Sequence, residues 1–321
     1  MERFVLNSDE VASLRNLIAE IAAKYGSAED PEFLEEATVW AQEMPRRLRA
    51  VLNRFRLAEP DSAHLIISGY PVDDEKIGRT PEHWNLPPES RRPSLEEEIY
   101  FVLVSSLLGE CIGWKTQQAG RIVHDVMPIR GMEQEQIGTG SEQTITWHTE
   151  DAFHPLRGDY LGMMCLRNPD HVPTTFASLE RVRLAAEDWQ TLFEPHYTIK
   201  ADLSHEREET GQPPEKIALL SGDPRSPYIR IDHYFMDPVE DNPRAQKAFE
   251  ALIEAIDGEI GDLVLAPGDI CFIDNFKAVH GRRAFKARYD GHDRWLKRVN
   301  ITRDLRKSRA ERETSTSRVI Q

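Results

Sequence analysis

A series of short apolar segments, separated by Gly, Pro, Asp or Asn, constrains the fold of this chain more than any other feature. The series starts near residue 115 and continues to about residue 303. Short apolar or alternating runs between turn residues are typical of β sandwiches and barrels. We therefore predict a mainly β fold with flanking helices. The prediction rests on segments 121–127, 143–148, 159–166, 196–202, 216–222, 228–232, 262–274 and 294–302.

The preceding part of the chain has mostly helical periodicity, with one short buried strand at 64–70. Asn7 and Glu10 have the spacing of a capping box, and apolar residues follow them at helical spacing. A further helix is predicted near 243–257, within the strand-rich part. These helices are expected to support the β core from outside.

The 321 residues are predicted to form a single domain. Residues 1–113 would provide mostly helical support, residues 114–303 the β core, and residues 304–321 a charged, frayed tail. The polar segment 203–216 is expected to be an inserted lid loop. A second lid candidate is the proline-rich, charged surface loop at 71–93.

Composition excludes several classes of protein. Lys and Arg number 40 against 55 Asp and Glu, a net charge of −15, which disfavours nucleic acids and anionic membranes as partners. No apolar run approaches the ~20 residues of a membrane span. Cys111, Cys165 and Cys271 are widely spaced among apolar neighbours, a pattern of reducing compartments. We expect a cytoplasmic protein without a membrane segment or an obligatory protein partner.

His148 and Glu150 occupy alternate positions in the segment W-H-T-E-D. Alternate residues of a strand face the same side with Cα atoms about 6.6 Å apart, so this imidazole and carboxylate can share a metal. His154 would lie about 20 Å away along the strand, so a later strand must supply a third ligand. His280, in A-V-H-G-R, is well placed to do so. Two imidazoles and a carboxylate on one face are typical of non-haem Fe(II) oxygenases. His148 alone would be interpreted as an ordinary strand histidine, and its combination with H-G-R and the basic residues after it favours the metal site.

Arg294 and Arg298 follow on the amphipathic segment R-W-L-K-R-V-N-I-T. Both would face the same side of a strand. A buried arginine needs an anion, and a planar guanidinium suits bidentate pairing with a carboxylate. The alternative is a pair of surface arginines on an edge strand.

Three long motifs resemble the clavaminate synthase-like group of Fe(II)/2-oxoglutarate-dependent oxygenases, and within it the L-arginine hydroxylases of natural-product biosynthesis. The likeness covers roughly residues 60–308. It implies a distorted double-stranded β-helix of the jelly-roll or cupin kind, and it implies Fe(II), 2-oxoglutarate and O₂ as cofactor and cosubstrates. The motifs are HTEDAFHPLRGDYLGMMCLRNPD with PTTFAS, PGDICFIDNFKAVHGRRAF, and RYDGHDRWLKRVNITRDLRKSR.

The resemblance also implies the residues that bind iron and 2-oxoglutarate. His148, Glu150 and His280 match the iron ligands. Arg294 matches the arginine that binds the distal carboxylate of 2-oxoglutarate. Thr174 matches the threonine that assists this arginine, and the threonine directly after it is the alternative.

Four further residues match substrate-binding positions of the arginine hydroxylases. Arg298 matches the residue that receives the α-carboxylate, and Gln117, or the glutamine after it, matches the one that binds main-chain groups. Asp232 matches the aspartate that binds the guanidinium. Tyr234 stands where those relatives have a second acidic residue, which leaves citrulline, lysine and a cyclised arginine derivative open as substrates.

The function implied is hydroxylation of an unactivated side-chain carbon, Cβ or Cγ, of a free basic or arginine-like L-amino acid, with succinate and CO₂ as co-products. Desaturation of the same substrate and hydroxylation of a peptide-bound residue are the alternatives. Halogenation is disfavoured, because Glu150 occupies the position that related halogenases leave open for chloride.

Overall fold

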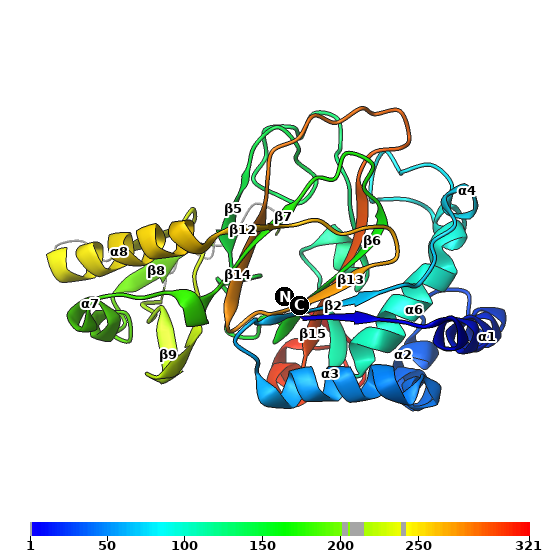
Figure 1. Cartoon of the computed structure of the whole chain (residues 1–321), viewed down its shortest axis with the longest axis horizontal. Coiled ribbons are helices and arrows are strands. Elements are labelled where there is room, and N and C mark those ends of the chain that lie inside the picture. Colours follow the sequence, from blue (N-terminus) through cyan, green and yellow to red (C-terminus); the bar gives the residue numbers. More distant parts are fainter. Residues whose placement is uncertain (1, 201–204, 206–214, 239–241) are drawn as a thin grey trace.

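Two β-sheets form the centre of the structure, a computed structural model that describes residues 2–200, 205, 215–238 and 242–321 (Figure 1). Among these residues the larger sheet has the strand order β1-β2-β13-β6-β15-β3-β16, with β4 paired to β15. Its strands are β1 (Glu2–Val5), β2 (His64–Ser68), β3 (Glu110–Trp114), β4 (His124–Val126), β6 (Tyr160–Arg167), β13 (Ile270–Asp274), β15 (Trp295–Thr302) and β16 (Val319–Ile320).

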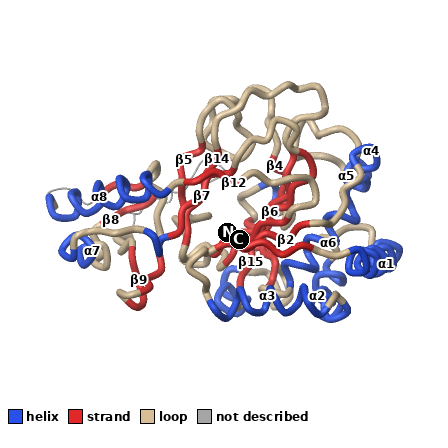
Figure 2. The backbone as a smooth tube through the Cα atoms, in the orientation of Figure 1, coloured by secondary structure: helices blue, strands red, loops and turns tan. Residues whose placement is uncertain are grey.

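The smaller sheet has the order β12-β7-β14-β5 in the described part of the chain, and all its pairings are antiparallel. Long loops cover the upper end of both sheets in the view of Figure 2. The sheet consists of β5 (Ile145–His148), β7 (Thr174–Ser178), β12 (Gly261–Leu263) and β14 (Ala278–Arg282).

Helices cover the larger sheet on one side (Figure 1). All residues of helix α6 except Glu96 are buried, and the helix packs between β15, β3 and the N-terminal helices. Asn7 caps the first helix, as its spacing predicted: its side chain accepts from the N–H of Glu10, whose carboxylate accepts from Asn7 in return. The helices of this layer are α1 (Ser8–Lys24), α2 (Pro31–Trp40), α3 (Arg46–Ala58) and α6 (Leu95–Ser106).

A second group of elements projects beyond the smaller sheet, at the left in Figure 1. Its apolar side chains form a core separate from the one beneath the larger sheet. The predicted helix near 243–257 is present here as α8. The group consists of α7 (Ala186–Thr191), α8 (Pro243–Glu259), β8 (Tyr197–Ile199), β9 (Leu220–Asp223), β10 (Ser226–Ile229) and β11 (Met236–Pro238).

Strand β15 presents different chemistry on its two faces. Leu296 and Arg298 line a pocket between the sheets, together with Arg294 just before the strand. Trp295 and Lys297 alternate with them and point toward the opposite side, where both donate to Asp125. This alternation follows from the two-residue period of side chains along a strand.

Three expectations need correction. The fold is mixed rather than mainly β, because helices occupy much of the N-terminal third as well as α7 and α8. The C-terminal segment is not frayed: it forms the 3₁₀ helix Leu305–Glu311 and strand β16, which pairs with β3. The 71–93 loop contains two one-turn helices, α4 (Asp74–Ile77) and α5 (Pro88–Arg91). The expected lid loop at 203–216 lies outside the described residues except for residues 205, 215 and 216.

The three cysteines are free and buried, in agreement with the reduced pattern expected of them. No helix in the described ranges is long and apolar enough to cross a membrane.

Candidate metal and anion site

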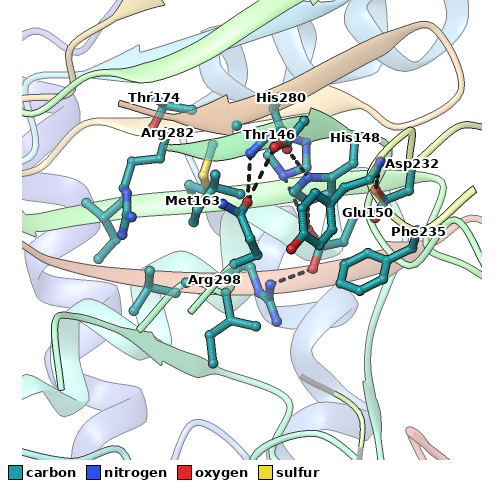
Figure 3. Close-up of a pocket in the computed structure, with 18 of the residues that line it drawn as sticks. Thr146, His148, Glu150, Met163, Thr174, Asp232, Phe235, His280, Arg282 and Arg298 are labelled. Carbon is teal, nitrogen blue, oxygen red and sulfur yellow. Dashed lines mark hydrogen bonds and ion pairs between the residues drawn. The ribbon is translucent and has the colours of Figure 1, made fainter. Parts of the chain in front are cut away.

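A pocket lies between the two sheets, lined by residues of β4, β6 and β15 on one side and of β5, β7 and β14 on the other (Figure 3). The segments 136–138 and 232–235 complete its wall. Eight of the nine residues predicted from the sequence line this pocket, and Gln117 is the one that does not.

The predicted metal ligands meet in this pocket. His148 and His280 are register partners on β5 and β14, with ring centroids 4.6 Å apart. Glu150 follows β5 in a turn, and its Oε2 lies 3.2 Å from Nε2 of His280 and 3.8 Å from Nε2 of His148. One ligand atom from each residue lies within 4.8 Å of the other two.

The donor atoms of this group suit a divalent cation. Nδ1 of His148 lies 2.8 Å from the carbonyl oxygen of Thr146, so that nitrogen carries a proton and Nε2 is the nitrogen directed toward Glu150. Lone pairs of two imidazoles and a carboxylate facing one another repel unless a cation or proton lies between them. A set of two nitrogens and one oxygen on one face fits a non-haem iron site.

Charges around the group keep Glu150 ionised. Burial would raise the pKa of this carboxyl, but the Arg298 guanidinium and the two histidines outweigh burial and hold the pKa well below its usual range. Burial lowers the pKa of His148, whereas the hydrogen bond to Glu150 and the charge of Asp232 raise it, with a net value of about 9. The pocket therefore stabilises positive charge at the position of the three ligands.

Asn275 fixes the backbone of Glu150, a role that the sequence analysis missed. Its Oδ1 accepts from the N–H of Glu150 at 2.7 Å, and its Nδ2 donates to the Glu150 carbonyl at 3.0 Å. The same Nδ2 donates to the carbonyl of Gly158. Because Asn275 follows β13, the larger sheet holds in place a ligand that extends from the smaller one.

Arg294 is buried in the pocket beside Thr174, whose Oγ1 accepts from its Nη2 at 3.4 Å. No carboxylate of the described residues forms an ion pair with Arg294, and burial lowers its pKa to about 10. Thr174 lines the pocket whereas Thr175 does not, so the structure favours Thr174 of the two alternatives.

Arg282 adds a second buried guanidinium that the sequence analysis did not assign. It donates to the main-chain carbonyls of Gly140 and Gln143, and burial together with the nearby charge of Arg294 lowers its pKa to about 9. Two buried cations that lack an acidic partner in the described part of the chain make this end of the pocket a candidate anion site.

Arg298 lies next to the metal group formed by His148, Glu150 and His280. Its Nη1 lies 2.5 Å from Oε1 of Glu150 (Figure 3). Oε1 is not the oxygen that contacts the two imidazoles. A guanidinium in this position leaves Oε2 directed toward His148 and His280.

Asp232 and Tyr234 lie at the opposite side of the pocket. Asp232 pairs with His148 through an isolated β-bridge, and its Oδ1 accepts from the N–H of Tyr234 at 3.2 Å. Tyr234 is 57% exposed and lines the pocket, so it lies at the pocket's mouth. The two residues are thus close in space and line the same pocket.

Gln117 is buried just after β3 and lies outside the lining of the pocket. The competing Gln118 uses both ends of its amide on the backbone of Asp125, accepting at 3.1 Å and donating at 2.9 Å. This commitment to the backbone argues against Gln118 as a substrate ligand.

The fold and the site together define the class of the protein: a metal group of two histidines and one glutamate lies beside a buried anion site, between two β-sheets. Residues 101–300 match the family model "Taurine catabolism dioxygenase TauD, TfdA family". The chain belongs to this family, and it is a non-haem iron, 2-oxoglutarate-dependent amino-acid hydroxylase.

Relatives with the same overall length support this assignment. Enduracididine beta-hydroxylase of Streptomyces hygroscopicus is 45% identical over 98% of both chains. L-ornithine/L-arginine 3-hydroxylase of Catenulispora acidiphila is 44% identical over 100% of both. The crystal structure of the non-heme iron oxygenase OrfP with Fe and alpha-ketoglutaric acid is 45% identical, matches with a TM-score of 0.93, and covers 99% of this chain and 100% of its own. The OrfP complex with Fe, succinate and (3S)-hydroxy-L-Arg matches with a TM-score of 0.95 at 43% identity, over the full length of both chains.

Proposed function

We propose that this enzyme hydroxylates a side-chain carbon of a free, arginine-like L-amino acid and releases succinate and CO₂. Cβ is favoured over Cγ, because the two curated relatives above are named as beta- and 3-hydroxylases. The observation that carries the proposal is the close approach of the metal group, the anion site and Asp232 within one pocket.

In this proposal His148, Glu150 and His280 hold the iron. Their ligand atoms converge within 4.8 Å, and Asn275 and Arg298 keep the carboxylate in place. Bound iron with 2-oxoglutarate and O₂ supplies the oxidising power that replaces a C–H bond by C–OH. The protein contributes the orientation of the reactants beside the iron.

Arg294 would bind the distal carboxylate of 2-oxoglutarate, with help from the hydroxyl of Thr174. Nε of Arg294 has no hydrogen-bond acceptor within the described residues, and an incoming carboxylate supplies one. Arg282 would add positive charge nearby, while both of its Nη groups bind main-chain carbonyls.

The amino acid would bind between Arg298 and Asp232. Arg298 would receive the α-carboxylate, and the carboxylate of Asp232 would bind the cationic end of the side chain. Gln117, expected to bind the main-chain groups, lies outside the pocket lining and has no place in this arrangement. Holding both ends of a flexible substrate selects the carbon that faces the iron. Tyr234 would cover the cationic end from the mouth of the pocket.

A cyclised arginine derivative is the second candidate substrate. A single carboxylate beside a phenol binds a guanidinium less firmly than two carboxylates would, so the side-chain end of the substrate need not be an unmodified guanidinium. The 45% identity to an enduracididine beta-hydroxylase favours the same candidate.

We further propose that the chain is one domain, that its two main sheets form the distorted double-stranded β-helix of the family, and that it works in the cytoplasm on a small molecule without a protein partner. The fold match over the full length of OrfP supports the first two points, and the three free, buried cysteines support the third.

A panel of free amino acids tests the proposal. The enzyme is incubated with Fe(II), ascorbate, 2-oxoglutarate and, one at a time, arginine, enduracididine, citrulline, lysine, ornithine and an arginine-containing peptide. We expect succinate release and a product heavier by one oxygen with arginine or enduracididine. A product lighter by two hydrogens would indicate desaturation instead. Turnover of the peptide but of no free amino acid would contradict the proposal.

A further inference from the structure

His124 is a buried histidine that is not one of the residues lining the pocket. It begins β4 and lies directly opposite Arg298 on the neighbouring strand β15. Its Nδ1 is 2.8 Å from Nη2 of Arg298, and its Nε2 is 2.8 Å from the carbonyl oxygen of Arg121. Both ring nitrogens are therefore committed to partners.

These two partners determine the protonation state of the ring. A guanidinium only donates hydrogen bonds and a carbonyl only accepts them, so Nδ1 must accept and Nε2–H must donate. Burial and the charge of Arg298 agree with this neutral form, since they lower the pKa of His124 to about 3. The ring therefore orients the guanidinium without neutralising its charge.

We propose that His124 is a positioning residue for the α-carboxylate subsite: it holds the Arg298 guanidinium where this group can contact both Glu150 and the carboxylate of the amino-acid substrate. This inference rests on the proposed function, in which Arg298 receives that carboxylate.

The geometry gives the reason. Nη1 of Arg298 pairs with Oε1 of Glu150 at 2.5 Å, and Nη2 contacts the imidazole. Without an acceptor at Nη2, both amino groups are able to rotate toward the Glu150 carboxylate as a bidentate pair, which is the preferred geometry of an isolated arginine and carboxylate. The guanidinium would then be less available to a second carboxylate. The imidazole prevents this because it anchors the second amino group from the side.

The experiment compares binding of L-arginine with binding of agmatine, its decarboxylated analogue, to enzyme loaded with 2-oxoglutarate and with Zn²⁺ in place of iron. Isothermal titration calorimetry measures both without turnover. The variants are His124→Phe, which removes the acceptor, and His124→Asn, whose Oδ1 restores an acceptor close to the position of Nδ1. His64→Phe is the matched control, because His64 is a buried strand histidine outside the pocket.

We expect His124→Phe to weaken L-arginine binding about tenfold, the value of one charge-assisted hydrogen bond, and to leave agmatine binding unchanged. His124→Asn is expected to recover most of the loss, and His64→Phe to bind both ligands like the wild type.

Equal weakening of both ligands by His124→Phe would overturn the inference, because it would indicate a purely structural role. Binding of neither ligand to the wild type would instead contradict the proposed substrate class, and equal binding of both to the wild type would contradict the assignment of Arg298.

Discussion

Replacing Lys297 by methionine is expected to destabilise the protein strongly although it leaves the pocket surface unchanged. The Lys297 side chain is 1% exposed, and its Nζ lies 2.6 Å from Oε1 of Glu98 and 2.6 Å from Oδ1 of Asp125. The methionine fills a similar volume but leaves two buried carboxylates without this cation. Asp125 keeps Arg121 as a partner at 2.7 Å. Breaking a buried ion pair in this way costs about 3 to 5 kcal/mol.

The loss of stability converts to a measurable shift in melting temperature. Unfolding entropy is about 2.1 cal/mol/K per residue, so 321 residues give about 0.7 kcal/mol/K. The expected decrease in Tm is therefore about 4 to 7 °C. Scanning calorimetry measures it, and urea unfolding should show a lower midpoint with an unchanged m-value.

Acid should reduce the stability of the wild type and of Lys297→Met to different extents. Burial raises the pKa of Asp125, but Lys297 and Arg121 outweigh burial and lower it to about 2. A depressed folded-state pKa gives stability that is fully present above the unfolded value near 4 and is lost as the pH falls toward 2. In Lys297→Met the pKa of Asp125 is less depressed, so stability should fall less steeply in that pH window.

Lys307→Met is the control for the loss of a lysine. The Lys307 side chain is 56% exposed and its Nζ lies 3.6 Å from Asp159. This variant should stay within about 0.5 kcal/mol of the wild type. Equal melting temperatures for Lys297→Met and Lys307→Met would refute the reasoning about the buried cluster.

Three further predictions concern the site. Glu150→Gln should weaken Zn²⁺ binding by more than about tenfold, because replacing even a residue that only supports a metal ligand costs about that much. An unchanged Zn²⁺ affinity in calorimetric titration would contradict the role of Glu150 as a metal ligand. Arg294→Met should weaken 2-oxoglutarate binding about ten- to hundredfold through loss of charged hydrogen bonds, whereas Arg283→Met, on an exposed ion pair with Asp262, should bind it normally. Asp232→Asn should raise the KM for arginine about tenfold or more and leave neutral citrulline little affected; an equal change for both substrates would count against a cation-binding role.

Local patterns predicted the metal site well because its chemistry depends on short spacings. The His148 and Glu150 pair required only the two-residue period of an extended chain, and the prediction holds although Glu150 lies in the turn after β5. The third ligand required strand pairing, and β14 does pair with β5 so that His280 faces His148.

The residues missed by the sequence analysis act through long-range pairing. Asn275 reaches Glu150 only because the turn after β13 lies beside the turn after β5. His124 meets Arg298 because β4 pairs with β15. Arg282 binds main-chain carbonyls of a loop that is distant in the sequence. Every residue has a main-chain carbonyl, so the sequence does not indicate which ones Arg282 binds. Strands β7 and β14 also lack a clear signal, because they are buried on both faces and show no polar alternation.

Strand β15 imposes a constraint on how this enzyme can change its substrate. Arg298 faces the pocket and Lys297 joins the buried cluster behind it, so a register slip of one residue would put the lysine among the catalytic groups and the arginine among the helices. An insertion or deletion within this strand would therefore damage reactivity and stability in a single event. New specificities are most readily acquired in the segments 136–138 and 232–235, which border the pocket but lie outside the strands of the two main sheets.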